Sequence, residues 1–428
     1  MSASAVSGRI DGVIARLHDL HPRLIDLSLD RLLALLAKLG HPEQRLPPIV
    51  HVGGTNGKGS TCAFLRAMAE ASGLRVHVYT SPHLVRFNER FRVAGELVTD
   101  SDLTEAMEAV ERANDGAPIT VFEVMTAAAF YLFAATPADL CVLEVGLGGR
   151  GDATNVIPPP AACAITSISL DHRELLGSTL DVIAREKAGI MKRAVPVATG
   201  SQPDDVIAVL DAEAERVGTR LLRRGRDWSI AASGNGLRFS DHLGEIELPL
   251  PSLAGPHQFD NAGIAVAAAR AGGLGIPDAA IARGIATAEW PARLQRLTGH
   301  LASRLPVGWE LWLDGGHNPG GGEALAAQLA IWRDRPVHLV VGMKQAKDSA
   351  EFLRPMIPLA ASLWAVSEPE QHNALPIEAI IAASGGIARP GPCITDALRQ
   401  LPREDGPARV LICGSLYLAG EVLKQDAS

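Results

Sequence analysis

The 428-residue sequence predicts an α/β protein with two domains, and three observations carry that prediction. Short apolar, β-branched runs alternate with helical patterns in the first half, which is typical of a parallel sheet covered by helices on both faces. A stretch of near-alternate apolar residues follows. A second, shorter series of strand and helix patterns then begins near Gly308.

The elements of the first half follow in a regular order. An amphipathic helical pattern from Asp30 to Leu39 is ended by Gly40 and Pro42. A first strand is expected around Val50. The later expected strands are Val76 to Thr80, Leu140 to Val145, Ala162 to Ile168 and Val195 to Thr199, and the expected helices between them are Ala63 to Ala71, Phe122 to Ala135 and Leu180 to Met191. Ligands are expected where the carboxyl ends of these strands meet.

The second half contains an appendage and a further α/β series. Between Arg226 and Leu250, apolar residues recur at alternate positions around Gly234-Asn235-Gly236, which indicates an antiparallel meander. The later strand patterns are 310–313, 337–341, 363–366 and 410–413, typical of a Rossmann-like domain. A polar stretch between Arg293 and Pro306 separates the two series, so we expect domains at 1–296 and 297–428.

The segment HVGGTNGKGST, His51 to Thr61, predicts a phosphate-binding loop. It follows a strand and opens a helix, so backbone N–H groups and the positive end of the helix dipole point to one place, and Lys58 adds a cation. Gly59 separates Lys58 from the hydroxyls, which departs from the general phosphate-loop pattern, and an ordinary glycine turn is the alternative. We expect ATP here, with magnesium near a Ser60 or Thr61 hydroxyl. The expected ATP contacts are Gly54, Thr55, Asn56, Gly57, Lys58, Gly59, Ser60 and Thr61.

Composition restricts the partners. A formal net charge of −8 without a long Lys/Arg run argues against nucleic acid as the main partner. Five widely spaced cysteines without CxxC spacing are expected to be reduced, as in the cytoplasm. No apolar run reaches membrane-spanning length, so we expect no membrane association. We expect a monomer.

Polar residues follow several expected strands. Glu144 ends an apolar strand before a glycine-rich loop and is placed to coordinate magnesium. Asp171 and His172 close the next strand, so we expect them at the edge that carries Glu144. Ser81 also ends a strand and has an oxygen that magnesium accepts, although a plain turn before Pro82 explains the pattern equally simply.

Eight segments, taken in order and spacing, resemble folylpolyglutamate synthase and the bifunctional dihydrofolate synthase/folylpolyglutamate synthase, relatives of the Mur ligases. They cover nearly the whole chain: HVGGTNGKGST at 51–61, TSPHL at 80–84, NERFRV at 88–93, EVGLGGRGDATNV at 144–156, REKAGIMK at 185–192, GPHQFDNA at 255–262, WPARLQ at 290–295 and LDGGHNPGG at 313–321. The resemblance implies a phosphate-loop (P-loop) ATPase domain of the Mur-ligase kind that also holds the pterin site, followed by a C-terminal glutamate-ligase domain.

The resemblance also implies roles for particular residues. Ser81, Glu144 and His172 match magnesium ligands, and Lys187 matches a lysine that is carbamylated toward a second metal. From its helical pattern alone, Lys187 would be a solvated lysine. Asn261, Arg293 and Asp314 match residues that hold the nucleotide between two domains, and His317 lies beside them, placed for phosphate contacts or glutamate placement. Lys58, Lys187 and His317 are therefore the expected catalytic residues.

By the same resemblance, dihydropteroate or the pterin end of a folate lies along one N-terminal segment and near two loops. Phe122 offers an aromatic face to a flat ring, although a core residue at a helix start is the alternative. Gly151 stands where a larger apolar residue is expected. The implied pterin-site residues are Ile25, Asp26, Leu27, Ser28, Pro82, His83, Phe122, Gly151, Asp152 and Ala153.

The implied activity is ATP-dependent amide formation. The γ-phosphoryl of ATP is transferred to a carboxylate, and the amino group of L-glutamate then displaces phosphate from the acyl phosphate. The stretch Asp152 to Asn155 resembles the bifunctional enzymes, which use dihydropteroate as well as reduced folates such as tetrahydrofolate; polyglutamylation alone is the alternative. A Mur-type peptidoglycan ligase is less consistent, since fewer than fifty residues precede the loop's strand. A non-catalytic nucleotide-binding regulator has no need of Glu144, His172 and Lys187.

Overall fold

The computed structural model describes residues 12–13, 16, 27–345, 347–402 and 406–427, and the chain separates into two compact units. Unit 1 comprises residues up to Ile168, Leu176–Leu250 and Asp260–Ala288. Unit 2 comprises Ser169–Leu175, Pro251–Phe259 and Glu289–Ser428. Two short segments that precede Glu289 in the chain, 169–175 and 251–259, therefore belong to the second unit.

Unit 1 is built on an eight-stranded sheet in the order β4-β3-β2-β5-β1-β6-β7-β8. From β2 to β8 all pairings are parallel, and β3 and β4 add an antiparallel edge. The strands are β1 Ile49–Gly53, β2 Val76–Tyr79, β3 Phe91–Val93, β4 Glu96–Leu97, β5 Leu140–Glu144, β6 Ala162–Ile165, β7 Val197–Thr199 and β8 Leu221–Arg223. The predicted parallel sheet is confirmed, and its antiparallel edge was not foreseen.

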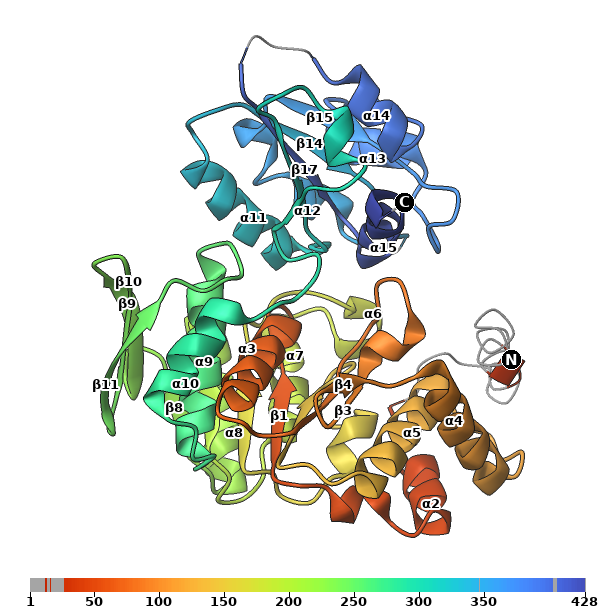
Figure 1. Ribbon diagram of the computed structural model, residues 1–428, viewed down its shortest axis with the longest axis vertical. Coiled ribbons are helices and arrows are strands. Elements are labelled where there is room, and N and C mark those ends of the chain that lie inside the picture. Colours follow the sequence, from red (N-terminus) through yellow and green to blue (C-terminus); the bar gives the residue numbers. More distant parts are fainter. Residues whose placement is uncertain (1–11, 14–15, 17–26, 346, 403–405, 428) are drawn as a thin grey trace. The chain divides into compact units, whose positions relative to one another are not determined.

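Helices cover both faces of this sheet, as the sequence predicts. Cys141 and Leu143 of β5 lie in a buried cluster with side chains of α2, α4 and α5, whereas α3 packs against β1, β2 and β5 from the other side, with α10 beside it (Figure 1). The helices of unit 1 are α2 Asp30–Lys38, α3 Lys58–Ala71, α4 Asp100–Asn114, α5 Val121–Ala135, α7 Leu180–Lys187, α8 Asp204–Val217, α9 His257–Ala271 (from Asp260 onward) and α10 Asp278–Thr287. The short helix α6 Arg173–Leu176 lies almost entirely in a segment of unit 2.

The predicted meander is a separate three-stranded antiparallel sheet. It consists of β9 Trp228–Ser233, β10 Gly236–Asp241 and β11 Gly244–Pro249. Within unit 1, this sheet packs on α9 and α10, because the Trp228 ring lies where a side chain at Gly263 of α9 would be and β11 contacts α10 (Figure 1).

Unit 2 contains a six-stranded sheet in the order β12-β13-β17-β14-β15-β16, parallel except for β12. Val337, Leu339 and Val341 of β14 point into a core with α11, α12 and α13. The elements are β12 Gln295–Leu297, β13 Glu310–Leu313, α11 Pro319–Ile331, β14 Val337–Val341, α12 Ser349–Leu353, β15 Ser362–Ala365, α13 Ile377–Ala383, β16 Arg389–Pro390, α14 Ile394–Gln400, β17 Arg409–Cys413 and α15 Leu416–Ala427. This is the expected smaller α/β series.

Two predicted elements end three or four residues earlier than expected. The strand expected to reach Ile168 ends at Ile165, because the chain turns there and the Ser167 carbonyl accepts bonds from Thr55 and Asn56. The helix expected to reach Met191 ends at Lys187 and continues as a 3-10 turn over Ala188–Ile190. None of the described helices is long and apolar enough to cross a membrane.

Candidate active site

The phosphate loop links β1 to α3 and needs glycine at two positions. Gly54 and Gly57 have φ values of 139° and 91°, in the region that favours glycine. A Cβ on Gly54 would lie 2.0 Å from Thr166 Oγ1, and one on Gly57 would lie 2.2 Å from Asn261 Oδ1. The loop therefore fits closely against its neighbours.

Hydrogen bonds fix the path of this loop. The N–H groups of Thr55 and Asn56 donate to Ser167 O over 2.8 and 3.1 Å. Lys58 begins α3, and its Nζ donates to Thr55 O over 3.1 Å. The first amides of α3 lie at the positive end of the helix dipole, where an anion is favoured.

Lys187 lies beside the phosphate loop and is buried, whereas its helical pattern alone predicted a solvent-exposed lysine. It is 5% exposed at the end of α7, and its Nζ donates to Gly54 O over 2.8 Å. Asn261, which touches Gly57, is equally buried on α9. The structure thus brings the expected residues Lys58, Lys187 and Asn261 to the same loop.

Glu144 and Ser81 meet at the carboxyl ends of β5 and β2. The Ser81 N–H donates to Glu144 Oε2 over 3.2 Å, and Glu144 is 5% exposed. Carboxylate and hydroxyl oxygens are both ligands that magnesium accepts. Within the described ranges, no three His, Cys, Asp or Glu side chains form a preformed metal site, so a metal here would need other oxygen donors, such as phosphates.

Asp152 is buried in the loop after β5 and accepts bonds on both carboxylate oxygens. Oδ2 accepts from Leu147 N over 2.8 Å, and Oδ1 accepts from Thr154 N over 2.9 Å and from Thr154 Oγ1 over 2.5 Å. Burial raises the pKa of Asp152, and these bonds oppose that rise. Asp152 therefore holds the glycine-rich loop in shape.

His51 of β1 extends this buried chain of bonds. Its Nε2 lies 2.8 Å from Thr154 Oγ1, whose hydrogen goes to Asp152, so His51 must donate through Nε2. Its buried Nδ1 has no hydrogen-bond partner among the described residues. Burial, with a smaller contribution from Lys192, lowers the pKa of His51 to about 3.

The residues expected at the pterin site differ in their surroundings. Leu27 lies against Gly151, where a Cβ would come 2.7 Å from Leu27 O, which explains why a larger residue is absent there. The Phe122 ring lies over Gly146 and is 6.2 Å from the Tyr79 ring. Ser28 is half-buried, Pro82 is exposed and Ala153 is in the core, whereas Ile25 and Asp26 lie outside the described residues.

His83 has a defined partner in the loop after β2. Its Nδ1 accepts from Arg90 Nε over 2.9 Å, and its ring lies 5.2 Å from that of Phe87. Glu89, to which sequence reasoning gave no role, accepts from the N–H groups of residues 84, 85 and 86 at 2.7 to 3.0 Å. The only signal for this role is its place three residues after Arg86, as in a capping box.

Arg293 and Asp314 lie together in unit 2. Asp314 accepts from Leu294 N over 2.8 Å and from Gly316 N over 2.7 Å, and Arg293 donates to Ala292 O over 2.8 Å. Ala292 and Leu294 have left-handed φ values of 55° and 43°, a conformation that non-glycine residues adopt at a cost. The strained backbone on both sides fixes the direction of Arg293.

His257, which sequence reasoning passed over, is close to these two residues. Burial lowers the pKa of His257, while Asp314 raises it and Arg293 lowers it further. Its position in GPHQFDNA, four residues before Asn261, was the available signal.

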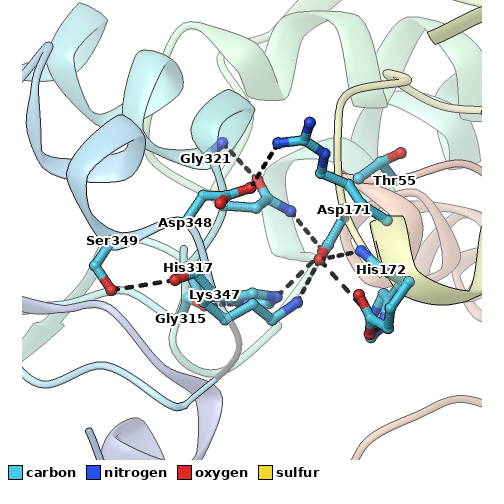
Figure 2. A network of polar contacts seen from close by, with 12 residues as sticks. Thr55, Asp171, His172, Gly315, His317, Gly321, Lys347, Asp348 and Ser349 are labelled. Atoms are coloured by element: carbon cyan, nitrogen blue, oxygen red, sulfur yellow. Dashed lines mark hydrogen bonds and ion pairs between the residues drawn. The ribbon is translucent and has the colours of Figure 1, made fainter. Parts of the chain in front are cut away.

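His172 and His317 both lie near the carboxylate of Asp171 in unit 2. His317 Nε2 lies 3.5 Å from Asp171 Oδ2, and His172 Nε2 lies 3.9 Å from Asp171 Oδ1. The His317 Nδ1 donates to Gly315 O over 2.9 Å (Figure 2). Burial lowers the pKa of His172 to about 4, against the opposing effect of Asp171. The segment that carries His172 thus belongs to unit 2, whereas Glu144 and Ser81 belong to unit 1.

Comparison with known proteins agrees with this arrangement. The sequence matches the Mur ligase middle domain over residues 52–269. It is 35% identical to the dihydrofolate synthase/folylpolyglutamate synthase of Escherichia coli, over 96% of this chain and 94% of that one. It is also 35% identical to the folylpolyglutamate synthase of Lacticaseibacillus casei, over 92% of each chain.

Solved structures give the same result. Escherichia coli FolC in complex with DHPP and ADP superimposes with a TM-score of 0.87 at 33% identity, over 97% of both chains. A bifunctional folylpolyglutamate synthase/dihydrofolate synthase with Mn, AMPPNP and L-glutamate bound superimposes with a TM-score of 0.85 at 32% identity, again over 97% of both chains. The chain therefore belongs to the family of folylpolyglutamate synthases and dihydrofolate synthase/folylpolyglutamate synthases, acid–amino-acid ligases that share the Mur ligase middle domain.

Proposed function

We propose that this chain uses ATP to join L-glutamate to dihydropteroate, which forms dihydrofolate, and to reduced folates such as tetrahydrofolate. The observation that carries the proposal is the phosphate loop beside Glu144 and Lys187 in a chain of this family. ADP, AMPPNP, Mn, L-glutamate and DHPP are bound in the related structures described above.

The proposed chemistry starts at the phosphate loop. A carboxylate is a poor acyl donor because its leaving group would be oxide, so the γ-phosphoryl of ATP moves to the substrate acid and ADP leaves. Lys58 and the amides of Gly57 to Ser60 would stabilise the charge on the transferring phosphoryl. The amino group of glutamate then attacks the acyl phosphate, an amide forms, and phosphate departs.

The proposed metal ligands are Ser81, Glu144 and His172. Magnesium bound there would neutralise charge on the phosphate oxygens. The 3.2 Å contact between Ser81 N and Glu144 Oε2 supports this, because it brings the two residues together. For a second metal we propose carbamylated Lys187, which is supported by its burial beside Gly54.

We further propose that the nucleotide is held by Asn261, Arg293 and Asp314 and that His317 contributes to phosphate or glutamate placement. In this proposal residues 1–296 form the ATP-binding domain with the pterin site, and residues 297–428 form the glutamate-ligase domain. The support is the buried contact of Asn261 with Gly57 and the fixed geometry around Arg293.

The pterin site is proposed along Ile25 to Ser28, near Pro82, His83, Phe122 and residues 151–153. The contact of Leu27 with Gly151 supports this, because it joins the first segment to the loop after β5. Polyglutamylation alone remains a second candidate, since the Lacticaseibacillus casei relative is named only for that activity.

The test supplies ATP, magnesium, glutamate and either dihydropteroate or tetrahydrofolate to the purified chain. We expect dihydrofolate from the first acid, a glutamylated folate from the second, and transfer of ¹⁸O from the acid carboxylate to phosphate. Product from tetrahydrofolate alone would restrict the activity to polyglutamylation. Phosphate without ¹⁸O would contradict the acyl phosphate.

A further inference from the structure

Asp171 is the most heavily bonded carboxylate in the part of unit 2 around His317. Its Oδ1 accepts from Lys347 Nζ and from the His172 N–H, the latter over 2.8 Å. Its Oδ2 accepts from Asn318 Nδ2 over 2.9 Å and lies 3.5 Å from His317 Nε2 (Figure 2). A carboxylate has about four acceptor sites, and these four contacts use them.

We infer that Asp171 is a positioning residue that fixes the backbone of His172, and so the direction in which its imidazole leaves the chain, and that Lys347 and Asn318 hold Asp171 in place. This inference rests on the proposed function, in which His172 is a metal ligand. Because its acceptor sites are taken, Asp171 is itself poorly placed to bind the metal. Outer partners of this kind commonly fix the direction of a metal-binding histidine.

The backbone of His172 needs such support. Its φ is 50°, in the left-handed region that is unfavourable for a residue with a side chain. The Asp171 carboxylate accepts the N–H of this same residue and also lies 3.9 Å from His172 Nε2. Asp171 therefore holds the strained backbone of His172 through this hydrogen bond.

Asp171 is in turn fixed by residues in the segments that follow two strands of the unit 2 sheet. Asn318 follows β13, and its Oδ1 caps α11 by accepting Gly321 N over 2.9 Å, so its Nδ2 is the group left to face Asp171. Lys347 follows β14. The side chains of Asp171 and Lys347 are 11% and 13% exposed, so this ion pair is screened much less than a surface pair.

Electrostatics agree with this geometry. The Lys347 ammonium lies against Asp171 Oδ1, so the buried carboxylate has an opposite charge beside it. Nearby, Arg173 and Asp348 form a second ion pair at 3.5 Å, but both are more than 40% exposed, so that pair contributes little.

The experiment compares Asp171→Asn with Glu174→Gln. Glu174 is the matched control, because it is also a carboxylate near His172, at 3.8 Å from Nδ1, but it is 60% exposed. The readout is Mn²⁺ binding in the presence of ADP, followed by electron paramagnetic resonance, together with kcat and KM for glutamate. We expect Asp171→Asn to weaken Mn²⁺ binding by about 10- to 100-fold. Glu174→Gln should change it less than about twofold.

Two further variants keep the test decisive if Asp171→Asn folds poorly. Lys347→Met should weaken Mn²⁺ binding in the same direction, and Lys347→Arg should restore most of it, since the ion pair is kept. Equal Mn²⁺ affinity in wild type, Asp171→Asn and Lys347→Met would overturn the inference. If the wild type forms no amide while the variants still lose Mn²⁺ affinity, the proposed function fails and the role of Asp171 stands.

Discussion

Replacing Asp152 by Asn should destabilise the loop after β5 by removing one of its buried hydrogen bonds. The substitution keeps the size of the side chain, but the amide supplies one acceptor where the carboxylate supplied two. In either orientation its NH₂ group faces donors, either Leu147 N or the N–H and hydroxyl of Thr154. At least one buried backbone N–H then loses its acceptor.

The magnitude follows from that lost acceptor. An unsatisfied buried donor costs about 1 to 3 kcal/mol, and this corresponds to a local opening equilibrium that is roughly 5- to 150-fold more favourable. Hydrogen–deuterium exchange followed by mass spectrometry should show this acceleration in peptides that cover residues 146–155. We expect the KM for the pterin acid to rise as a consequence.

The matched control is Asp139→Asn. Asp139 also accepts a backbone N–H, from Arg75 over 2.8 Å, but its side chain is 40% exposed, so water can replace the lost bond. Exchange near Asp139 should change little. If Asp152→Asn raised the KM for the pterin acid with unchanged exchange over residues 146–155, Asp152 would act by direct contact and the argument from the loop would be refuted.

Three further predictions concern the phosphate loop and the strand before it. Lys58→Ala should lower kcat by at least about 10²- to 10³-fold in the ligation assay, with a melting temperature close to that of wild type, and near-normal turnover would contradict its role. Gly57→Ala should raise the KM for ATP at least about tenfold, because the added Cβ would meet Asn261 at 2.2 Å. Gly73 has a similar φ of 87° but lies in open space, so Gly73→Ala should leave the KM for ATP unchanged. His51 has a pKa of about 3 in the folded protein and about 6.5 in the unfolded chain, so the free energy of unfolding should fall as the pH drops below about 6.5, by up to about 1.4 kcal/mol per pH unit. His51→Gln should reduce this loss, measured by urea unfolding at pH 7 and pH 5. An unchanged pH dependence in the variant would count against this prediction.

Local patterns were sufficient to predict most of the fold. The run from His51 to Thr61 contains a strand, two glycines with positive φ and a helix start, and each of these depends on neighbouring residues only. The meander was predictable for the same reason, since alternation and a Gly-Asn-Gly turn suffice. The antiparallel edge was missed because β3 and β4 have three and two residues, too few for a periodic signal.

Long-range contacts explain what the sequence did not predict. Lys187 was expected in solvent on its pattern alone, and its burial depends on the approach of Gly54, more than a hundred residues away. Just after α7, Gly189 packs closely against Arg150, a contact between residues far apart in the chain. The grouping of Asp171 with Lys347 joins segments 176 residues apart, so no local pattern could indicate it.

The alternation of the chain between its two units has a practical consequence for dissecting the protein. The backbone leaves unit 1 for residues 169–175 and again for 251–259 before it enters unit 2 for the last time at Glu289. A single cut near residue 289 would therefore separate segments 169–175 and 251–259 from the rest of unit 2, against which they pack. Separate expression of either half would require these short pieces to be grafted or redesigned, and exchanging C-terminal halves between relatives would require matching loops at both places.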